Sequence, residues 1–255
     1  MSMLFVLGLF LAAVTAVRST WSPCGLSMLS VITPLQEQGR GNRFRATATW
    51  FLLGATVGGV MLGGVMAALA AGWARIGAST ETALLITALG ALVSVISDGR
   101  LFGFQLPGHD RQVNERWLDQ YRSWVYGAGF GWQIGVGLAT YIITSGLYLL
   151  ILIAALSAST SGAFILGTVF GLVRGLAVFA AGDVTTPEAL KDLHRRFERW
   201  RHWVRKLTIA VVAVIGVVAG LVVGSPLTTA VAGLVILAAG AALRGERETS
   251  YVLAR

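Results

Sequence analysis

Two arginines stand inside long apolar stretches of this 255-residue chain, where charged side chains are rare. A guanidinium group in such a setting is costly unless it reaches a polar interface, pairs with another group or lines a cavity. Arg174 lies well inside its stretch, and no Asp or Glu lies in any of the apolar stretches. We therefore expect Arg174 to bind backbone carbonyls or an anionic ligand. For Arg18, which lies near a proline, an interfacial position is an equal alternative.

The single cysteine of the chain, Cys24, follows Pro23 within the first apolar stretch. Proline lacks an amide donor and interrupts a helix, and backbone groups freed at membrane depth must be covered by protein or water. We therefore expect Cys24 to face the interior of a helix bundle at a kink. Two interpretations stay open: a reactive thiol beside the break, or a small buried apolar residue. One cysteine allows neither an internal disulfide nor a four-cysteine zinc site.

A glycine-rich stretch from 127 to 137 carries two more polar side chains, Trp132 and Gln133. We expect both to donate hydrogen bonds into the same interior as Arg174, with ordinary bonding between helices as the alternative. Together with Pro23, three glycines of this stretch mark the predicted helix breaks: Gly129, Gly131 and Gly135.

Metal and cofactor sites are not expected. The three histidines, His109, His194 and His202, have no neighbours at metal-ligand spacing. The chain also contains no P-loop and no G-x-S-x-G motif. The only enzymatic activity left open is that of an electron carrier of the thiol–disulfide oxidoreductase kind.

Long apolar helices must carry these residues. Hydrophobic residues make up 55% of the chain, charged residues 13%, and the mean hydropathy is +0.73. A soluble globular protein carries about 25% charged residues, so this composition indicates a membrane protein. A helix needs about 20 mostly apolar residues to cross a bilayer. Seven stretches are predicted to do so: 3–28, 46–73, 82–97, 124–156, 162–181, 207–224 and 227–243.

Basic residues lie in every second gap between these stretches. All but three of the 20 lysines and arginines fall in the gaps 36–45, 98–123 and 182–206 or in the tail after residue 243. Basic residues resist translocation, so this side is predicted to be cytoplasmic. The N-terminus is then outside and the C-terminus inside an inner or plasma membrane. The net charge of +8 fits an anionic inner leaflet, and no nucleic-acid partner is expected.

Two of the basic gaps have the pattern of amphipathic helices. In 187–206, apolar residues recur at alternating spacings of three and four: Leu190, Leu193, Phe197, Trp200, Val204 and Leu207. The segment 98–123 and its border show a shorter pattern: Val113, Trp117, Tyr121 and Trp124. Both helices are predicted to lie in the cytoplasmic membrane interface, with partner binding as the alternative.

The order of the apolar stretches indicates an all-α membrane bundle built from two inverted three-helix repeats. The repeats are 1–97 and 124–224, joined by the interfacial segment 98–123 and followed by an extra helix and tail at 225–255. Each repeat begins with an irregular helix, and interrupted segments at matching places in inverted halves indicate a central binding site. All four parts form one transmembrane domain.

Two motifs resemble the transmembrane family of cytochrome c biogenesis and thiol–disulfide interchange proteins (the CcdA/DsbD type). These are Ser22-Pro23-Cys24 in the first apolar stretch and the glycine-rich run 129–135 in the fourth. The resemblance implies two inverted three-helix repeats and a thiol relay in which Cys24 is the first cysteine. The second cysteine position falls near Ile134, so the resolving thiol would have to belong to a partner.

Three functions stay open from the sequence. One is a membrane redox protein that uses Cys24 and a thiol-bearing partner. Another is a transporter of a small, anionic solute that uses Arg174 and Arg18. The third is a non-catalytic membrane assembly or scaffold factor with another membrane subunit as its partner. We give preference to a membrane protein on the CcdA/DsbD-like scaffold with a polar central site, which takes part in thiol redox chemistry or cytochrome c biogenesis with a partner thiol.

Overall fold

Every ordered element of the described residues is a helix. The computed structural model describes residues 3–108, 120–140 and 142–252. The predicted amphipathic residues Val113 and Trp117, and His109, lie outside these ranges. The helices are α1 (Met3–Ser19), α2 (Pro23–Val31), α3 (Pro34–Gly39), α4 (Phe44–Ile76), α5 (Thr80–Gly99), η1 (Leu101–Gly103), α7 (Ser123–Val136), α8 (Gly146–Leu156), α9 (Thr160–Leu176), η2 (Ala177–Ala181), α10 (Pro187–Val223) and α11 (Pro226–Val252).

The helices are those of a multi-pass membrane protein. Five are long and apolar enough to cross a bilayer: α4, α5, α9 with η2, α10 and α11. Helices α1 and α2 meet the same test as a pair that is bent by 65° at a short break, which gives up to six spans. The predicted fourth span, 124–156, is not one helix, because it is divided into α7 with 14 residues and α8 with 11. The predicted count of seven is therefore not confirmed.

The predicted break at Gly129, Gly131 and Gly135 is wrong. All three glycines lie inside the continuous helix α7, and the chain leaves the helix at Gly137, whose φ is 73°. The glycines serve close packing instead. A Cβ atom on Gly131 or Gly135 would lie 2.0 Å from a carbonyl oxygen of α4, so these positions bring the backbones of α7 and α4 together.

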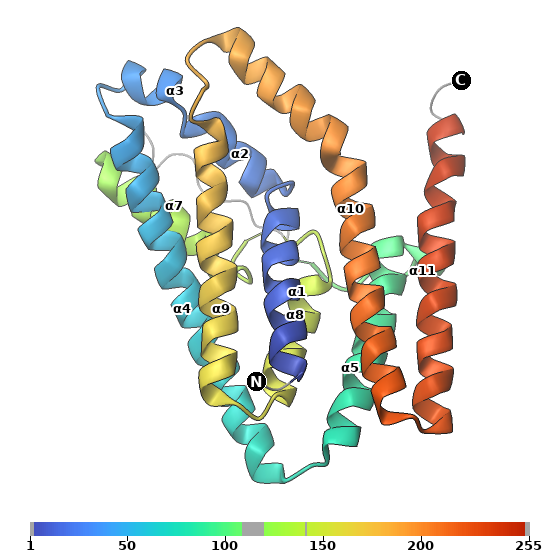
Figure 1. Ribbon diagram of the computed structural model, residues 1–255. Coiled ribbons are helices and arrows are strands. Elements are labelled where there is room, and N and C mark those ends of the chain that lie inside the picture. The colour runs from blue at the N-terminus through green and yellow to red at the C-terminus, as the bar shows by residue number, and fades with distance from the viewer. Residues whose placement is uncertain (1–2, 109–119, 141, 253–255) are drawn as a thin grey trace.

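Glycines also join α4 to α9. A Cβ atom on Gly63 would lie 2.4 Å from the carbonyl oxygen of Phe164, and one on Gly167 would lie 2.3 Å from the amide nitrogen of Gly63. Helix α4 therefore packs along α7 and α9 on one side of the molecule (Figure 1). Helices α5, α10 and α11 pack together on the other side, and α1 and α8 lie between the two groups.

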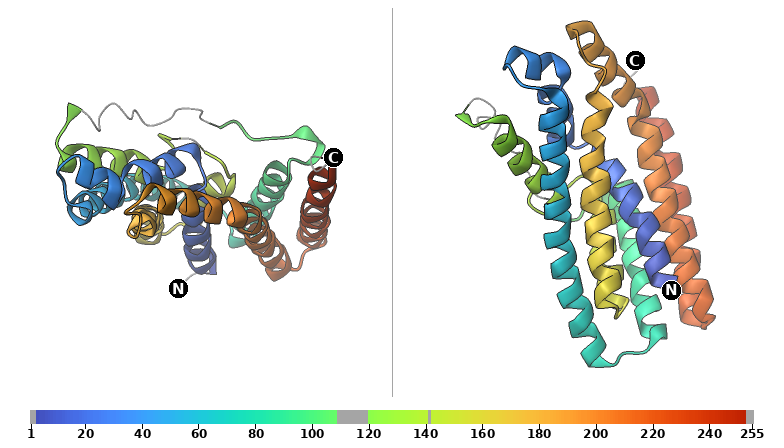
Figure 2. Two further views of the ribbon diagram at one scale, coloured as in Figure 1. Left: turned by 90° about the horizontal axis from the view of Figure 1, so that it is seen from above. Right: turned by 60° about the vertical axis from the view of Figure 1, so that its left-hand side comes forward.

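The predicted separation of an interfacial helix 187–206 from a span 207–224 is also wrong. Both segments form the single 37-residue helix α10, because no glycine or proline interrupts residues 188–215. The first half of α10 runs obliquely across the top of the molecule (Figures 1 and 2). There Leu193 is buried, and Leu190 and Phe197 pack against the same apolar cluster as Cys24. Protein rather than lipid therefore covers this part of the apolar stripe.

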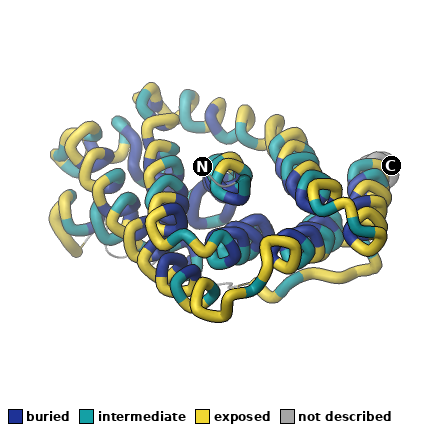
Figure 3. The backbone as a smooth tube through the Cα atoms, turned by 60° about the horizontal axis from the view of Figure 1, so that its bottom comes forward, coloured by how far each residue is buried: buried dark blue, intermediate teal, exposed yellow. Residues whose placement is uncertain are grey.

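Burial divides each helix into an inner and an outer face. Viewed from below, buried residues concentrate on the faces that helices turn toward one another (Figure 3). The outer faces carry exposed apolar side chains such as Phe10, Val57 and Leu237. Apolar residues exposed in this way suit contact with lipid.

Basic residues concentrate at one end of the bundle. The connections 77–79, 157–159 and 224–225 lie at the lower end in Figure 1, together with the N-terminus, and none of them contains Lys or Arg. Helix α3 and the arginine-rich first half of α10 lie at the upper end. The two ends of the bundle therefore differ in charge, as the spacing along the chain predicts.

Candidate functional site

The break between α1 and α2 is built by local capping. The Ser22 hydroxyl accepts a hydrogen bond from the amide of Gly25 at 3.1 Å, and Pro23 occupies the first turn of α2. Both are favoured features of a helix start. A Cβ atom on Gly25 would lie 2.3 Å from the Thr20 carbonyl oxygen, so only glycine permits the sharp change of direction.

Arg174 is buried and binds the end of a broken helix. Its side chain is 3% exposed, and Nη1 donates a hydrogen bond of 2.7 Å to the carbonyl oxygen of Ile134 in α7. Nη2 lies 3.5 Å from the Thr140 hydroxyl, and the guanidinium carbon lies 5.8 Å from the centroid of the Phe170 ring. A cation is favourable there because carbonyl groups at a helix C-terminus lack partners and carry partial negative charge. Of the two predicted roles, Arg174 fulfils the one of binding backbone carbonyls.

Cys24 meets Arg174 at the same place. The Cys24 side chain is 1% exposed and belongs to an apolar cluster with Phe130 and Ile134 of α7. Ile134 also supplies the carbonyl oxygen that accepts the Arg174 hydrogen bond, so the two residues meet through Ile134. Helices α2, α7 and α9 therefore converge on one small site, which we call the Cys24–Arg174 centre; it consists of Cys24, Ile134, Thr140 and Arg174.

The structure does not bring the other predicted residues to this centre. Trp132 is exposed on the outside of α7, and its indole nitrogen lies 2.9 Å from the sulfur of Met61. Gln133 is half-buried and has no hydrogen bond to the centre within the described part of the chain. Spacing along α7 places these two side chains on a different face from Ile134.

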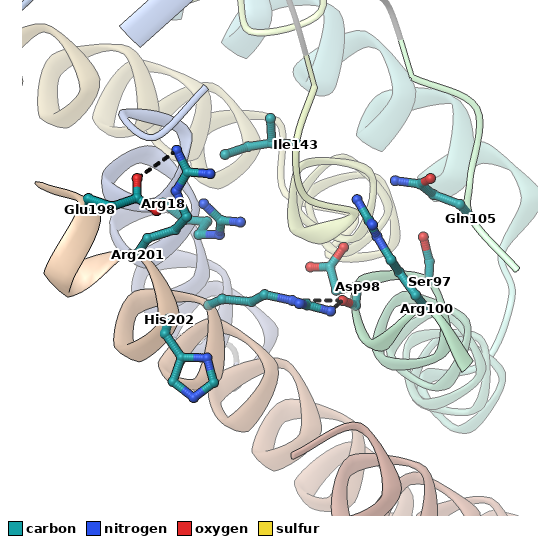
Figure 4. Close-up of a pocket in the computed structure, with 10 residues that line it drawn as sticks. Arg18, Ser97, Asp98, Arg100, Gln105, Ile143, Glu198, Arg201 and His202 are labelled. Atoms are coloured by element: carbon teal, nitrogen blue, oxygen red, sulfur yellow. Dashed lines mark hydrogen bonds and ion pairs between the residues drawn. The ribbon is translucent and has the colours of Figure 1, made fainter. Parts of the chain in front are cut away.

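Arg18 lies on the other side of the α1–α2 break, in a second polar site. With arginines from two other parts of the chain it lines a pocket of about 320 Å³ between α1, the end of α5 and α10 (Figure 4). The indole of Trp21, in the break itself, donates a hydrogen bond of 2.7 Å to the Phe197 carbonyl oxygen and stacks on the Phe197 ring. The break is thereby tied to α10.

A buried glutamate is the polar residue that the sequence analysis missed. The Glu37 carboxylate is fully buried and accepts hydrogen bonds from the Tyr126 hydroxyl at 2.7 Å and the Thr47 hydroxyl at 2.5 Å. Arg40 pairs with it at 3.1 Å. The cluster joins α3, α4 and α7. A short Glu-x-x-Arg segment between two apolar stretches resembles a solvated connection, and only Thr33-Pro34, a helix start signal, indicated local order.

The chain is similar to methylamine utilization proteins named MauF. It is 33% identical to the MauF protein of Paracoccus denitrificans over 168 residues, which cover 63% of this chain and 58% of the relative. It is 32% identical to that of Methylophilus methylotrophus over 179 residues, 67% of this chain and 61% of the relative. It is 30% identical to the MauF protein of Methylobacillus flagellatus over 178 residues, which cover 67% of this chain and 62% of the relative.

These similarities cover only part of each relative. The chain spans about three fifths of the length of the curated proteins that it matches. No family model matches the chain. No solved structure matches it either.

The resemblance to the cytochrome c biogenesis and thiol–disulfide interchange family is therefore wrong, because the matching proteins carry the MauF name instead. The structure supplies the physical reason. Ser22-Pro23 forms a helix N-terminus, and Gly131 and Gly135 allow two helices to approach. Both motifs meet general requirements of helix starts and helix packing, which unrelated membrane proteins share.

Proposed function

We propose that this protein serves methylamine utilization as a multi-pass protein of the plasma membrane. The observation that carries the proposal is the identity of 30–33% to MauF proteins from three organisms. The apolar helices support a membrane location. Its partner in this role is another component of the methylamine utilization system, and its contribution is that of an assembly or scaffold factor.

The polar groups at the Cys24–Arg174 centre support a scaffold better than a reaction site. The guanidinium of Arg174 already binds the Ile134 carbonyl and lies over the Phe170 ring. Cys24 is almost completely buried among apolar side chains. These contacts fix α2, α7 and α9 relative to one another. A fixed arrangement of helices suits a protein whose role is to bind a partner in the membrane.

Inverted halves remain part of the proposal. Helices α1 and α2 form a broken element at the start of one half, and α7 and α8 form another at the start of the second. Helix α4 packs against α7, and α9 packs in the corresponding way against α1. This correspondence supports a pseudo-twofold relation between residues 1–97 and 124–224, with the Cys24–Arg174 centre between the broken helices.

The charge of the two ends supports an orientation with the N-terminus outside. The end that carries α3 and the first half of α10 is rich in arginine, whereas the opposite connections contain no Lys or Arg. Basic segments are retained on the cytoplasmic side. The loop 77–79 then faces the outside and α3 the cytoplasm.

Complementation tests the proposed function. A Paracoccus denitrificans strain without its own MauF gene is given this chain and grown with methylamine or with a carbon source that needs no methylamine utilization. We expect growth on methylamine to recover and growth on the second source to stay unchanged. Because the chain spans about three fifths of that relative, a chimera that carries the relative's remaining residues is tested in parallel. Failure of both, with each protein present in the membrane by immunoblot, would contradict the proposal.

The same strain separates this proposal from the thiol and transport predictions. The name of the relatives supports neither a thiol relay nor a transporter. We expect Cys24→Ala to restore growth, since an assembly factor needs no thiol chemistry. A Cys24→Ala protein that is present in the membrane but gives no growth would contradict the non-catalytic role.

A further inference from the structure

Three separate parts of the chain bring arginines to one pocket. Arg18 comes from the end of α1, Arg100 from the residue after α5, and Arg201 and Arg205 from successive turns of α10. Figure 4 shows Arg18, Arg100 and Arg201 around a common space, with Asp98 and Glu198 at its edge. We call this site the basic pocket. Its neighbouring hollow shares Arg18, Arg100 and Arg201 and extends to Leu26 and Ile142.

The carboxylates of the basic pocket are already engaged. Asp98 accepts hydrogen bonds from the Thr144 hydroxyl at 2.6 Å and from the amide and hydroxyl of Ser145, each at 2.7 Å. Glu198 forms an ion pair with Arg201 at 3.0 Å. Among the residues that the structure describes, four guanidinium groups and two carboxylates line the pocket, and one of these carboxylates is held by neutral donors of the 144–145 segment. The described lining residues of the pocket therefore carry an excess of positive charge.

Backbone contacts hold the pocket in shape. Arg205 donates through Nε and Nη2 to the Asp98 carbonyl oxygen, at 3.2 and 2.7 Å, and so fixes α10 to the end of α5. Arg100 has a left-handed backbone, with a φ of 53°, and caps α5, and its side chain lines the pocket in Figure 4. These contacts fix the end of α5 against α10, so the two elements that carry Arg100, Arg201 and Arg205 have a set arrangement.

We propose that the basic pocket binds a phosphate group. Guanidinium groups match the oxygens of phosphate with paired hydrogen bonds, and several arginines on different elements suit an anion with several oxygens. A volume of about 320 Å³ accommodates a phosphate with a small organic substituent. The pocket lies where α10 changes from its arginine-rich half to its apolar half, so the phosphate comes either from a phospholipid headgroup or from a soluble ion.

Binding measurements on the purified 255-residue chain test the proposal. The probes are inorganic phosphate, followed by calorimetry in a neutral detergent, and phosphatidylglycerol against phosphatidylcholine, followed by native mass spectrometry. Retention of phosphatidylglycerol alone identifies a lipid headgroup, and saturable binding of phosphate identifies a soluble ion. Either result supports the proposal, and absence of both overturns it.

Paired variants show whether the pocket is responsible. Arg18→Gln/Arg100→Gln removes two charges from the pocket, and Arg195→Gln/Arg199→Gln removes two exposed charges of α10 that lie outside it. We expect Arg18→Gln/Arg100→Gln to weaken binding of the probe that binds the wild-type protein by about tenfold or more. The control Arg195→Gln/Arg199→Gln should weaken it by less than about twofold. Equal losses would show general surface attraction and would overturn the proposal. If the first pair does not fold, Arg100→Gln alone gives the same comparison, because Arg100 is exposed outside the helix core.

Discussion

At the scale of single residues, the environment decides what an unusual side chain does. Arg174 and Arg18 look alike in sequence, since each is an arginine in an apolar stretch. In the structure, Arg174 is buried against the end of α7, and Arg18 lines a polar pocket beside α10. One arginine joins helices, whereas the other contributes charge to a cavity.

Replacement of Arg174 is expected to loosen this joint. In Arg174→Met the Ile134 carbonyl and the Thr140 hydroxyl lose their charged donor inside the protein. Loss of a hydrogen bond to a charged group lowers the free energy of unfolding by about 1.5–3 kcal/mol. Thermal unfolding in detergent measures the change. The exposed Arg199→Met is the matched control, with an expected change within about 0.5 kcal/mol; a similar change in both variants would refute the role of Arg174.

Burial of Cys24 predicts slow reaction with thiol reagents. Because the side chain is 1% exposed and is the only cysteine, maleimide labelling of the wild-type protein reports on this position alone. We expect labelling to require denaturation. A cysteine at the exposed Ser79, placed in a Cys24→Ala background, serves as the control and reacts at once. Rapid labelling of native Cys24 would reveal an open path to the thiol and would argue against a purely structural role.

At the scale of elements, small residues determine which helices meet. Helix α7, with 14 residues, is short for a membrane span. Its close contact with α4 along Gly131 and Gly135 helps to hold it in the bundle. The buried Glu37 cluster adds polar contacts between α3, α4 and α7 at one end of this interface. The two sets of contacts hold α7 in place, and α7 carries the Ile134 carbonyl to Arg174.

A methyl group at Gly135 is expected to separate α7 from α4. In Gly135→Ala the new Cβ would lie 2.0 Å from the carbonyl oxygen of Ala55, so the backbones must move apart. Overpacking of this kind costs about 1–3 kcal/mol. Gly64→Ala in α4 is the control, because nothing lies within 4 Å of its Cβ, and it should stabilise the helix by about 0.5–1 kcal/mol. Equal melting temperatures for the two variants would rule out this interface.

At the scale of the whole molecule, charge separates the ends of the bundle while apolar faces surround its middle. The connections at the end that holds the N-terminus lack Lys and Arg, and arginines gather at the other end. The basic pocket lies beside the break between α1 and α2, where the arginine-rich half of α10 reaches the bundle. The molecule therefore has a basic end, polar sites at the break between α1 and α2, and apolar outer faces around its middle.

The proposed orientation predicts opposite accessibility for two loops. In a Cys24→Ala background, a cysteine at Ser79 should react with a membrane-impermeant maleimide in intact cells. A cysteine at the exposed Gln38 in α3 should react only after the membrane is permeabilised, since basic segments stay in the cytoplasm. The reverse pattern would show that the chain is inserted the other way round.

The sequence by itself determined that the chain forms apolar helices and how its charges divide between two ends. Both properties depend only on local sequence. The length of an apolar run decides whether its helix can cross a bilayer, and the position of basic residues along the chain decides which connections carry charge. The kink beside Pro23 follows from the same local rules, and the break between α1 and α2 lies there.

Only the tertiary structure decided which residues meet. Arg174 and Ile134 are 40 residues apart, and Tyr126 and Glu37 are 89 apart. Their contacts depend on how α4, α7 and α9 approach, which no single segment specifies. For the same reason Gly131 and Gly135 serve helix packing instead of a break, and the buried Glu37 could not be told from a solvated charge. A residue's periodicity is a property of its own segment, but its burial depends on distant helices.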